Sequence, residues 1–407
     1  MDFSRIELDE ELDAFLDDQV RPFMDEHLPG DVVDRERREG NGFVPEYQRA
    51  LAARGWLEPW LAEADDGSAL DPVRAAIVRA EETDRVGPLF PVVGSHSLVM
   101  SVVKQFASDA LRTEIATGVH RGEIQTCLGY TEPDCGSDAA AIRTRAVRDG
   151  DEWLLTGQKM FSTGAHLCQY AMITARTNPE VAKHQGITMF LVPLDHPGVE
   201  VQGIGTLGGE RTNFIYFDET RLADIYRLGP VDQGWPIASG ALAAEHGMDE
   251  SHGAIPDHGA SEGDLVRALE AVTGWLGVFG RALDAAVDWA QHTTTPEGSR
   301  VIDDPAVRLR LARVALDCAV AQITPNPYRR VIASDLLIRD TAELLDMTGV
   351  AGVLASGEDG AAAGGTLEWA HRFAQGTSIY GGTTDIQRNL IAEHFLGLPR
   401  HRGALRR

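Results

Sequence analysis

The middle third of the chain changes from helical to strand periodicity, and this change constrains the fold more than any other feature. From about residue 127 to about residue 235, short runs of β-forming residues alternate with turn-forming residues. The runs are residues 152–156, 169–174, 187–193, 199–204 and 214–218. Asp149-Gly150-Asp151 is typical of a hairpin turn before the first of them. The spacing predicts an antiparallel sandwich or barrel of modest size.

Helical periodicity is found on both sides of this β-rich region. Apolar residues recur at helical spacing in residues 8–23, 44–56, 72–83 and 94–106, and then in 266–289, 305–324, 328–347 and 366–398. The later group predicts a four-helix bundle, and the low-complexity residues 359–365 predict a flexible loop. We therefore expect a multidomain α+β protein with these domains: all-α at 1–125, an antiparallel β-barrel or sandwich at 126–235, and a C-terminal helical bundle at 236–407.

Composition excludes several classes of partner. The formal net charge of −25 argues against binding to nucleic acid or to an anionic membrane. No apolar run approaches the ~20 residues that span a bilayer, and the N-terminus has no signal-peptide core. We therefore expect a cytoplasmic protein that does not bind membranes.

The cysteines and histidines do not form a metal-binding pattern. The four cysteines have neither metal-ligand spacing nor a dense disulfide framework, so we expect reduced thiols. His252 and His258 lie six residues apart in a loop rich in glycine, without a cysteine or a third histidine nearby. The sequence therefore predicts no metal site.

Two stretches in the β-rich region carry candidate functional residues. Residues 129–138 (GYTEPDCGSD) form a proline-stiffened loop that could offer backbone N–H groups and hydroxyls to a polar ligand. Residues 157–165 (GQKMFSTGA) combine an aromatic side chain with hydroxyls. Taken alone, the first is as often a plain polar loop, and an aromatic residue in a strand is more often part of a core.

A third stretch lies near the C-terminus, at residues 378–392 (SIYGGTTDIQRNLIA). Its glycine pair predicts a tight turn whose backbone is open to a ligand. Apolar residues then recur at helical spacing, so the turn leads into an amphipathic helix. Thr383, Thr384 and Asp385 lie where N-caps and ligand contacts of the first turn are found.

Together the three stretches resemble the signature motifs of the acyl-CoA dehydrogenases. They are similar to Thr-Glu-Pro-Gly-Ala-Gly-Ser-Asp, to Gly-Gln-Lys-x-Trp-x-Ser/Thr-x-Gly/Ala and to Ile-Tyr-Glu-Gly-Thr-Ser-Glu-Ile-Gln-Arg-Asn-Ile-Ile-Ala. The domain order resembles that family along essentially the full chain. The resemblance implies FAD-dependent α,β-dehydrogenation of an acyl thioester carried by CoA or by a carrier protein, bulky or branched acyl groups included. A base removes the α-proton and a hydride passes to flavin N5.

The resemblance also implies roles for individual residues. Thr131 would touch the flavin ring, Gly136 and Ser137 would approach the pyrophosphate, and Phe161 would shield the isoalloxazine where the family has tryptophan. The expected cofactor-binding residues are Tyr130, Thr131, Gly136, Ser137, Phe161, Thr163, Gly382, Thr383 and Asp385. The expected substrate-binding residues are Ser137 and Gly381.

The catalytic base is the open question. Many family members use the glutamate of the C-terminal signature, but here Gly381 keeps the backbone donor and supplies no carboxylate. Other branches take the base from a Leu-x-x-Glu-Arg pattern, which residues 242–246 (LAAEH) resemble. Glu245 is therefore the expected base, although it could be a surface carboxylate displaced by the insertion at 247–263. The weaker alternatives are Asp249, Glu250 and Asp385.

The resemblance implies an oligomer and leaves two other functions open. The Arg-x-x-Phe-Gly segment that reaches a neighbouring subunit's FAD is missing, and Arg300 in the corresponding stretch is a candidate substitute. A Tyr-Gly-Gly-Thr signature without that segment is similar to actinobacterial α2β2 enzymes that act on steroid-derived acyl-CoAs. We expect a homo- or hetero-oligomer, a dimer or tetramer, with an electron-transfer flavoprotein or similar acceptor. The alternatives are a catalytically incomplete subunit and another flavin reaction, oxidase or monooxygenase.

Overall fold

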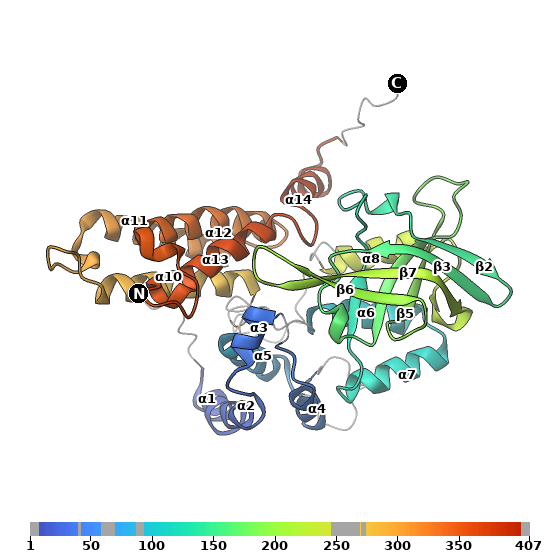
Figure 1. Cartoon of the computed structure of the whole chain (residues 1–407), viewed down its shortest axis with the longest axis horizontal. Coiled ribbons are helices and arrows are strands. Elements are labelled where there is room, and N and C mark those ends of the chain that lie inside the picture. The colour runs from blue at the N-terminus through green and yellow to red at the C-terminus, as the bar shows by residue number, and fades with distance from the viewer. Residues whose placement is uncertain are drawn as a thin grey trace. The chain divides into compact units, whose positions relative to one another are not determined.

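The chain forms two compact units (Figure 1). The computed structural model describes residues 8–39, 42–57, 70–86, 93–245, 269 and 274–399. Of the described residues, those up to 245 together with residue 269 belong to one unit, and residues 274–399 belong to the other. No helix in the described part of the chain is long and apolar enough to cross a bilayer.

The first unit begins with short helices around an aromatic core. These helices are α1 (Glu10–Phe15), a π-helical turn (Leu16–Val20), α2 (Arg21–His27), α3 (Val32–Glu39), α4 (Pro45–Ala53), α5 (Pro72–Val86), α6 (Val93–Phe106) and α7 (Asp109–His120). Asp9 caps α1 by accepting the Leu12 N–H at 2.9 Å. Phe23 packs edge-to-face on Trp56 with 5.2 Å between ring centroids. The expected helices at 8–23, 44–56, 72–83 and 94–106 all correspond to observed helices.

An eight-stranded sheet follows in the same unit. Its strands are β1 (Thr126–Gly129), β2 (Arg145–Asp149), β3 (Glu152–Lys159), β4 (Tyr170–Arg176), β5 (Ile187–Pro193), β6 (Val199–Gly205), β7 (Arg211–Ala223) and β8 (Arg227–Leu228). Every expected run is a strand, and the expected hairpin pairs Asp149 with Glu152 around Gly150 at φ 65°. The sheet departs from the expected antiparallel pattern where β4 pairs in parallel with β1 and β2.

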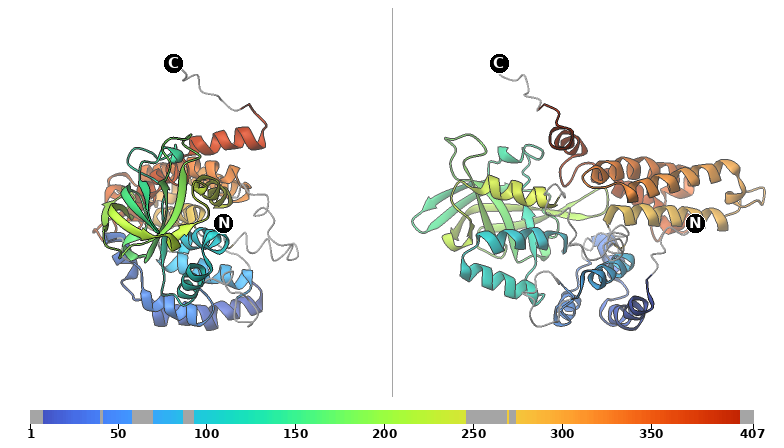
Figure 2. Two further views of the ribbon diagram at one scale, coloured as in Figure 1. Left: turned by 90° about the vertical axis from the view of Figure 1, so that its right-hand side faces the viewer. Right: turned by 180° about the vertical axis from the view of Figure 1, so that it is seen from behind.

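Both faces of the sheet are covered near β5, all of whose residues are buried. Met189 and Leu191 pack with α6, α7 and α8 (Gly234–Glu245), which lie against one face (Figure 2). Phe190 and Val192 point into a second core with Trp153. A strand buried on both faces has no polar positions, which explains why its sequence is a continuous apolar run.

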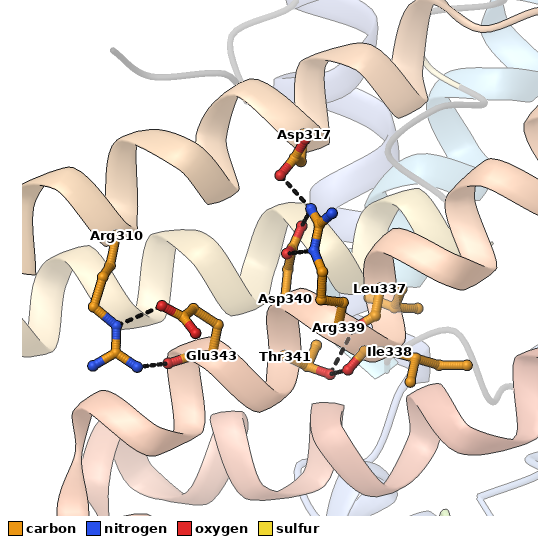
Figure 3. Close-up of polar contacts among 8 residues, drawn as sticks. All are labelled: Arg310, Asp317, Leu337, Ile338, Arg339, Asp340, Thr341 and Glu343. Atoms are coloured by element: carbon orange, nitrogen blue, oxygen red, sulfur yellow. Dashed lines mark hydrogen bonds and ion pairs between the residues drawn. The ribbon is translucent and has the colours of Figure 1, made fainter.

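The second unit is a four-helix bundle, as expected. It consists of α10 (Gly274–His292), α11 (Pro305–Ile323), α12 (Tyr328–Met347) and α13 (Thr366–Thr377), with α14 (Thr384–Leu390) beyond them. Ion pairs join α11 to α12: the Nε of Arg310 donates to Glu343 Oε1 at 2.6 Å, and Arg339 pairs with Asp317 (Figure 3). Arg339 also pairs with Asp340 of its own helix. Of the expected helix 266–289, the described part begins at Gly274.

The expectation of a flexible loop at 359–365 is wrong. Residues Ala362–Gly365 form a turn with left-handed backbone at Ala363 and Gly364, and Ala362 and Gly365 are buried. Gly365 has φ 81°, and a Cβ there would come within 2.4 Å of the Ser356 nitrogen. Glycine is required at Gly365, where the backbone is left-handed and a larger side chain would clash.

Candidate functional site

A buried ion pair fixes the loop at 129–138 to the end of strand β3. Lys159 Nζ donates to Glu132 Oε1 at 2.7 Å, and the two side chains are 0% and 5% exposed. The Glu132 carboxylate also accepts the backbone N–H groups of Arg143 at 2.6 Å and Thr144 at 3.1 Å. The Met160 N–H donates to the Thr131 carbonyl at 2.9 Å. The loop at 129–138 is therefore held to the end of strand β3 by both side-chain and backbone hydrogen bonds.

The two members of the pair shift each other's pKa in favour of the charged form. Burial by itself would raise the pKa of Glu132, but the Lys159 ammonium and the N–H donors outweigh it and hold that pKa below its ordinary value. Burial lowers the pKa of Lys159, and the Glu132 carboxylate opposes this. Each charge therefore keeps the other ionised in the interior.

The loop at 129–138 contains a tight turn, and the residues that follow the turn are exposed. Glu132 and Cys135 exchange backbone hydrogen bonds at 3.0 and 3.1 Å. Asp134, which stands where the family signature has glycine, pairs with Arg143 at 2.7 Å. Apart from Gly136 and its two chain neighbours, no atom of the described residues lies within 4 Å of the position that a Cβ on Gly136 would occupy, and Ser137 is exposed. A ligand could therefore approach the backbone closely at Gly136.

Beyond β3 the chain turns and presents an aromatic side chain to solvent. Phe161 has φ 59° and is 55% exposed, both unusual for a large aromatic residue. Asn213 holds the next residue from both sides: its carbonyl accepts the Ser162 N–H, and its Nδ2 donates to the Ser162 carbonyl, each at 3.0 Å. Such strain costs roughly 1–3 kcal/mol and is typical of ligand sites.

These residues fit a flat aromatic cofactor. Phe161 offers an exposed ring, and Thr163 beside it is exposed, with its hydroxyl 3.4 Å from that of Thr212. The Ser162 Oγ is buried and has no hydrogen-bond partner among the described residues. An orphaned hydroxyl beside an exposed ring indicates that a polar ligand completes this surface.

The second unit contains the glycine turn and the helix that the sequence predicted. Gly381 and Gly382 have φ 62° and 79°. Thr383 then caps α14, its Oγ1 accepting the Ile386 N–H at 3.2 Å. Asp385 is exposed in the first turn of α14. The turn is therefore preformed, with glycine where left-handed backbone is required.

The expected base is only partly described. Glu245 is the last residue of α8, and its side chain lies outside the described part of the chain. The alternatives Asp249 and Glu250, like His252 and His258, also lie outside the described residues. Among the side chains that are described, no three His, Cys, Asp or Glu residues cluster as metal ligands.

The possible substitute arginine is engaged within its own loop. Arg300 pairs with Asp303 at 2.9 Å. The cavity beside it has a volume of about 480 Å³ and is lined by Gln291, His292, Arg300, Ile302, Asp303 and Arg308. The structure therefore leaves the role of Arg300 as a prediction.

The structure groups the candidate residues into two sets. Tyr130, Thr131, Gly136, Ser137, Phe161 and Thr163 belong to the first unit, and Gly381, Gly382, Thr383 and Asp385 belong to the second. Sequence reasoning missed Glu132, Lys159 and Asn213, which hold the first set. Glu132 and Lys159 each lie inside one of the two motifs, and the opposite signs of their charges were the only sequence signal for a pair.

Comparison with known proteins gives one consistent result. The chain matches the acyl-CoA dehydrogenase N-terminal domain at residues 9–123, the middle domain at 127–220 and the C-terminal domain at 266–326 and 330–396.

Relatives and solved structures agree with these matches. Acyl-CoA dehydrogenase IpdE1 of Mycobacterium tuberculosis is 32% identical, over 67% of this chain and 67% of that protein. Acyl-CoA dehydrogenase FadE26 of the same organism is 27% identical, over 85% and 86%. The structure described as "Tcur3481-Tcur3483 steroid ACAD" has a TM-score of 0.78 at 25% identity, covering 98% of this chain and all of that one.

Replacing Lys159 tests the buried pair. Lys159→Met leaves Glu132 buried without its cation, so we expect the free energy of unfolding to fall by about 3–5 kcal/mol in a denaturant titration. The deficit should shrink as the pH is lowered, because burial without Lys159 raises the pKa of Glu132 and protonation then removes the uncompensated charge.

Two further variants act as controls. Lys183→Met removes an exposed ion pair to Asp138 (48% and 57% exposed) in the same unit and should cost under about 1 kcal/mol. Glu132→Gln combined with Lys159→Met should recover at least half of the loss. Equal losses for Lys159→Met and Lys183→Met would contradict a structural role for the buried pair.

Proposed function

The chain belongs to the acyl-CoA dehydrogenase family, and from this premise we propose that it removes hydrogen from the α and β carbons of a bulky acyl-CoA. The family members are FAD-dependent oxidoreductases that act on CH–CH groups. The observation that carries the proposal is the preformed surface around Phe161: an exposed ring, an orphaned Ser162 hydroxyl and a loop locked by Glu132 and Lys159. FAD, when bound, supplies the hydride acceptor.

The first unit would hold the cofactor. Phe161 covers the flavin face, the Thr131 and Thr163 hydroxyls meet polar edges of the ring, and Gly136 admits the pyrophosphate close to the backbone. Ser137 and Tyr130 complete that loop. For Gly382, Thr383 and Asp385 of the second unit, flavin contact is proposed from the resemblance of their motif alone. The strained backbone at Phe161 and the open space at Gly136 support this assignment.

Removal of the α-proton would need two groups: a backbone N–H that stabilises the developing negative charge and a carboxylate that accepts the proton. The Gly381 N–H donates to the thioester carbonyl, which stabilises the negative charge that develops when the α-proton leaves. With the charge stabilised, a carboxylate is a strong enough base to remove the α-proton. Glu245, at the end of α8, is our candidate for that base, and the alternative is a carboxylate from a partner chain.

We further propose a bulky, ring-containing substrate and an electron-transfer flavoprotein or similar acceptor. A solved structure similar to this chain is described as a steroid ACAD and is named for two proteins, Tcur3481 and Tcur3483. Gly381 has no side chain where many family members have glutamate, which leaves room for a wide acyl group. The carrier is CoA in this proposal, with a carrier protein as the alternative.

An exposed apolar stripe on α11 supports assembly with another chain of the same fold. Leu309, Leu316, Val320 and Ile323 are 66%, 64%, 38% and 82% exposed. They recur at intervals of seven, four and three residues, so they share one helix face. The opposite face of α11, with Leu311, Val314 and Cys318, is buried in the bundle. An exposed apolar stripe that spans about four helical turns is typical of an interface.

The function is tested with the purified protein, alone and with co-expressed dehydrogenase-like partners. We expect a yellow flavin spectrum that bleaches anaerobically with steroid-derived acyl-CoAs. Glu245→Gln should lower kcat by roughly 10²–10⁴-fold while flavin remains bound. The exposed Glu358→Gln is the control and should leave kcat unchanged.

Each other outcome has a defined meaning. Absence of flavin both alone and with partners contradicts the proposal. Activity that appears only with a partner and survives Glu245→Gln identifies a catalytically incomplete subunit. Stoichiometric peroxide in place of acceptor reduction identifies an oxidase or monooxygenase.

The role of the α11 stripe in assembly is tested by measuring the mass of the oligomer in solution. Leu316→Glu places a charge in the middle of the stripe, so we expect a lower mass in light scattering than for the wild-type assembly. Val147→Glu changes another exposed apolar residue, 46% exposed on β2, and should leave the mass unchanged. An assembly of unchanged mass in Leu316→Glu would contradict the use of α11 as an interface.

A further inference from the structure

We infer that Arg330 is a positioning residue that turns the backbone N–H of Gly381 toward the thioester carbonyl. The inference rests on the proposed function and adds a residue that none of the sequence motifs contains. Arg330 lies in the first turn of α12, fifty-one positions before Gly381 in the sequence. It reaches the glycine turn only because α12 and α13 pack together in the bundle.

Arg330 binds the turn by its carbonyl oxygens. Its Nη1 donates to the Thr377 carbonyl at 2.9 Å, at the end of α13. Its Nη2 donates to the Tyr380 carbonyl and, at 3.4 Å, to that of Gly382. The planar guanidinium presents several donors in a fixed geometry, so one side chain holds three carbonyls.

Aromatic contacts fix the guanidinium in place. Its carbon lies 3.8 Å from the centroid of the Trp275 ring, a close cation–π contact. The Trp275 ring in turn meets Tyr380 edge-to-face, with 5.5 Å between centroids. Trp275 therefore contacts both the arginine and the residue whose carbonyl the arginine binds.

A second side chain holds the remaining carbonyl of the turn. Gln387, which is 1% exposed, donates through Nε2 to the Gly381 carbonyl at 3.2 Å. The carbonyls of Tyr380, Gly381 and Gly382 are thus all bound to side chains of the second unit.

The direction of the N–H groups follows from the planar trans peptide. In such a peptide the C=O of one residue and the N–H of the next point in opposite directions. Because the Tyr380 carbonyl points to Arg330, the Gly381 N–H points away from Arg330. The N–H groups of Gly381, Gly382 and Thr383 donate no hydrogen bond within the part of the chain that is described. They remain available to a ligand.

The glycine pair makes such a clamp necessary. Glycine populates positive and negative φ about equally, so a Gly-Gly peptide can flip at little steric cost. Arg330 and Gln387 select one orientation. The positive charge of Arg330 also polarises the Tyr380–Gly381 peptide, because charge-assisted hydrogen bonds in a chain strengthen one another. The Gly381 N–H is then a better donor to a developing oxyanion.

The test compares Arg330→Met with two other variants in the flavin-loaded protein. Methionine keeps apolar packing on Trp275 but cannot bind carbonyls. We expect kcat to fall roughly 10²-fold, as for loss of one oxyanion donor, with KM within about threefold of wild type. Arg329→Met is the matched control, because Arg329 is the next residue of α12 and donates to the Thr324 carbonyl in another loop. Arg330→Lys should recover part of the activity.

A spectroscopic readout separates positioning from stability. Acetoacetyl-CoA forms an enolate whose absorbance can be titrated with pH, and a donor at its thioester carbonyl stabilises the enolate. In wild type and Arg329→Met we expect the bound probe to ionise at a lower pH than free probe. In Arg330→Met the enolisation equilibrium should weaken by at least roughly tenfold.

Failure of the inference differs from failure of the proposed function. If the wild type turns over acyl-CoA and Arg330→Met matches it in kcat and in probe ionisation, Arg330 does not position the donor. If the wild-type protein turns over acyl-CoA but does not lower the pH of probe ionisation, Gly381 is not the donor and the inference also fails. Wild type without flavin or turnover refutes the proposed function itself.

Discussion

The buried contact between Lys159 and Glu132 is the interaction on which the candidate cofactor surface depends. It joins a loop to a strand end through groups that cannot be exposed to water without disrupting the sheet. An unpaired charge at either position would be costly, so a change of one residue alone should destabilise the fold more than a change of both. Phe161, two residues after Lys159, adopts a strained left-handed backbone. The surrounding hydrogen bonds, including those of Asn213, hold it there.

The same physical principle recurs in the second unit with a different cation. Lys159 orders the loop of the first unit through a carboxylate, whereas Arg330 orders the glycine turn through carbonyls. In both units, a polar group near the hydrogen-bonded cation makes no hydrogen bond of its own within the described part of the chain. The hydroxyl of Ser162 and the N–H of Gly381 make no hydrogen bond among the described residues. Preorganised, unsatisfied groups of this kind are what a polar ligand or a developing oxyanion requires.

Periodicity predicted the elements well because it reflects local burial. The bounds of β5 and α12 follow from their apolar patterns alone, since every residue of β5 is buried and α12 has a regular helical stripe. The pairing of Glu132 with Lys159 could not be predicted the same way, because it depends on sheet register across 27 positions. The turn at 362–365 was mistaken for a loop, because small residues in a low-complexity stretch can serve packing as well as flexibility. Glu245 remains a prediction from resemblance.

The account is tested most directly by a crystal structure of the protein with FAD and an unreactive acyl-CoA analogue. It predicts the isoalloxazine ring against Phe161, a hydrogen bond from the flavin to Thr131, and the Glu132–Lys159 contact intact beneath them. It also predicts the thioester carbonyl within hydrogen-bond distance of the Gly381 nitrogen. A flavin bound away from Phe161, or a thioester carbonyl that does not meet Gly381, would contradict it.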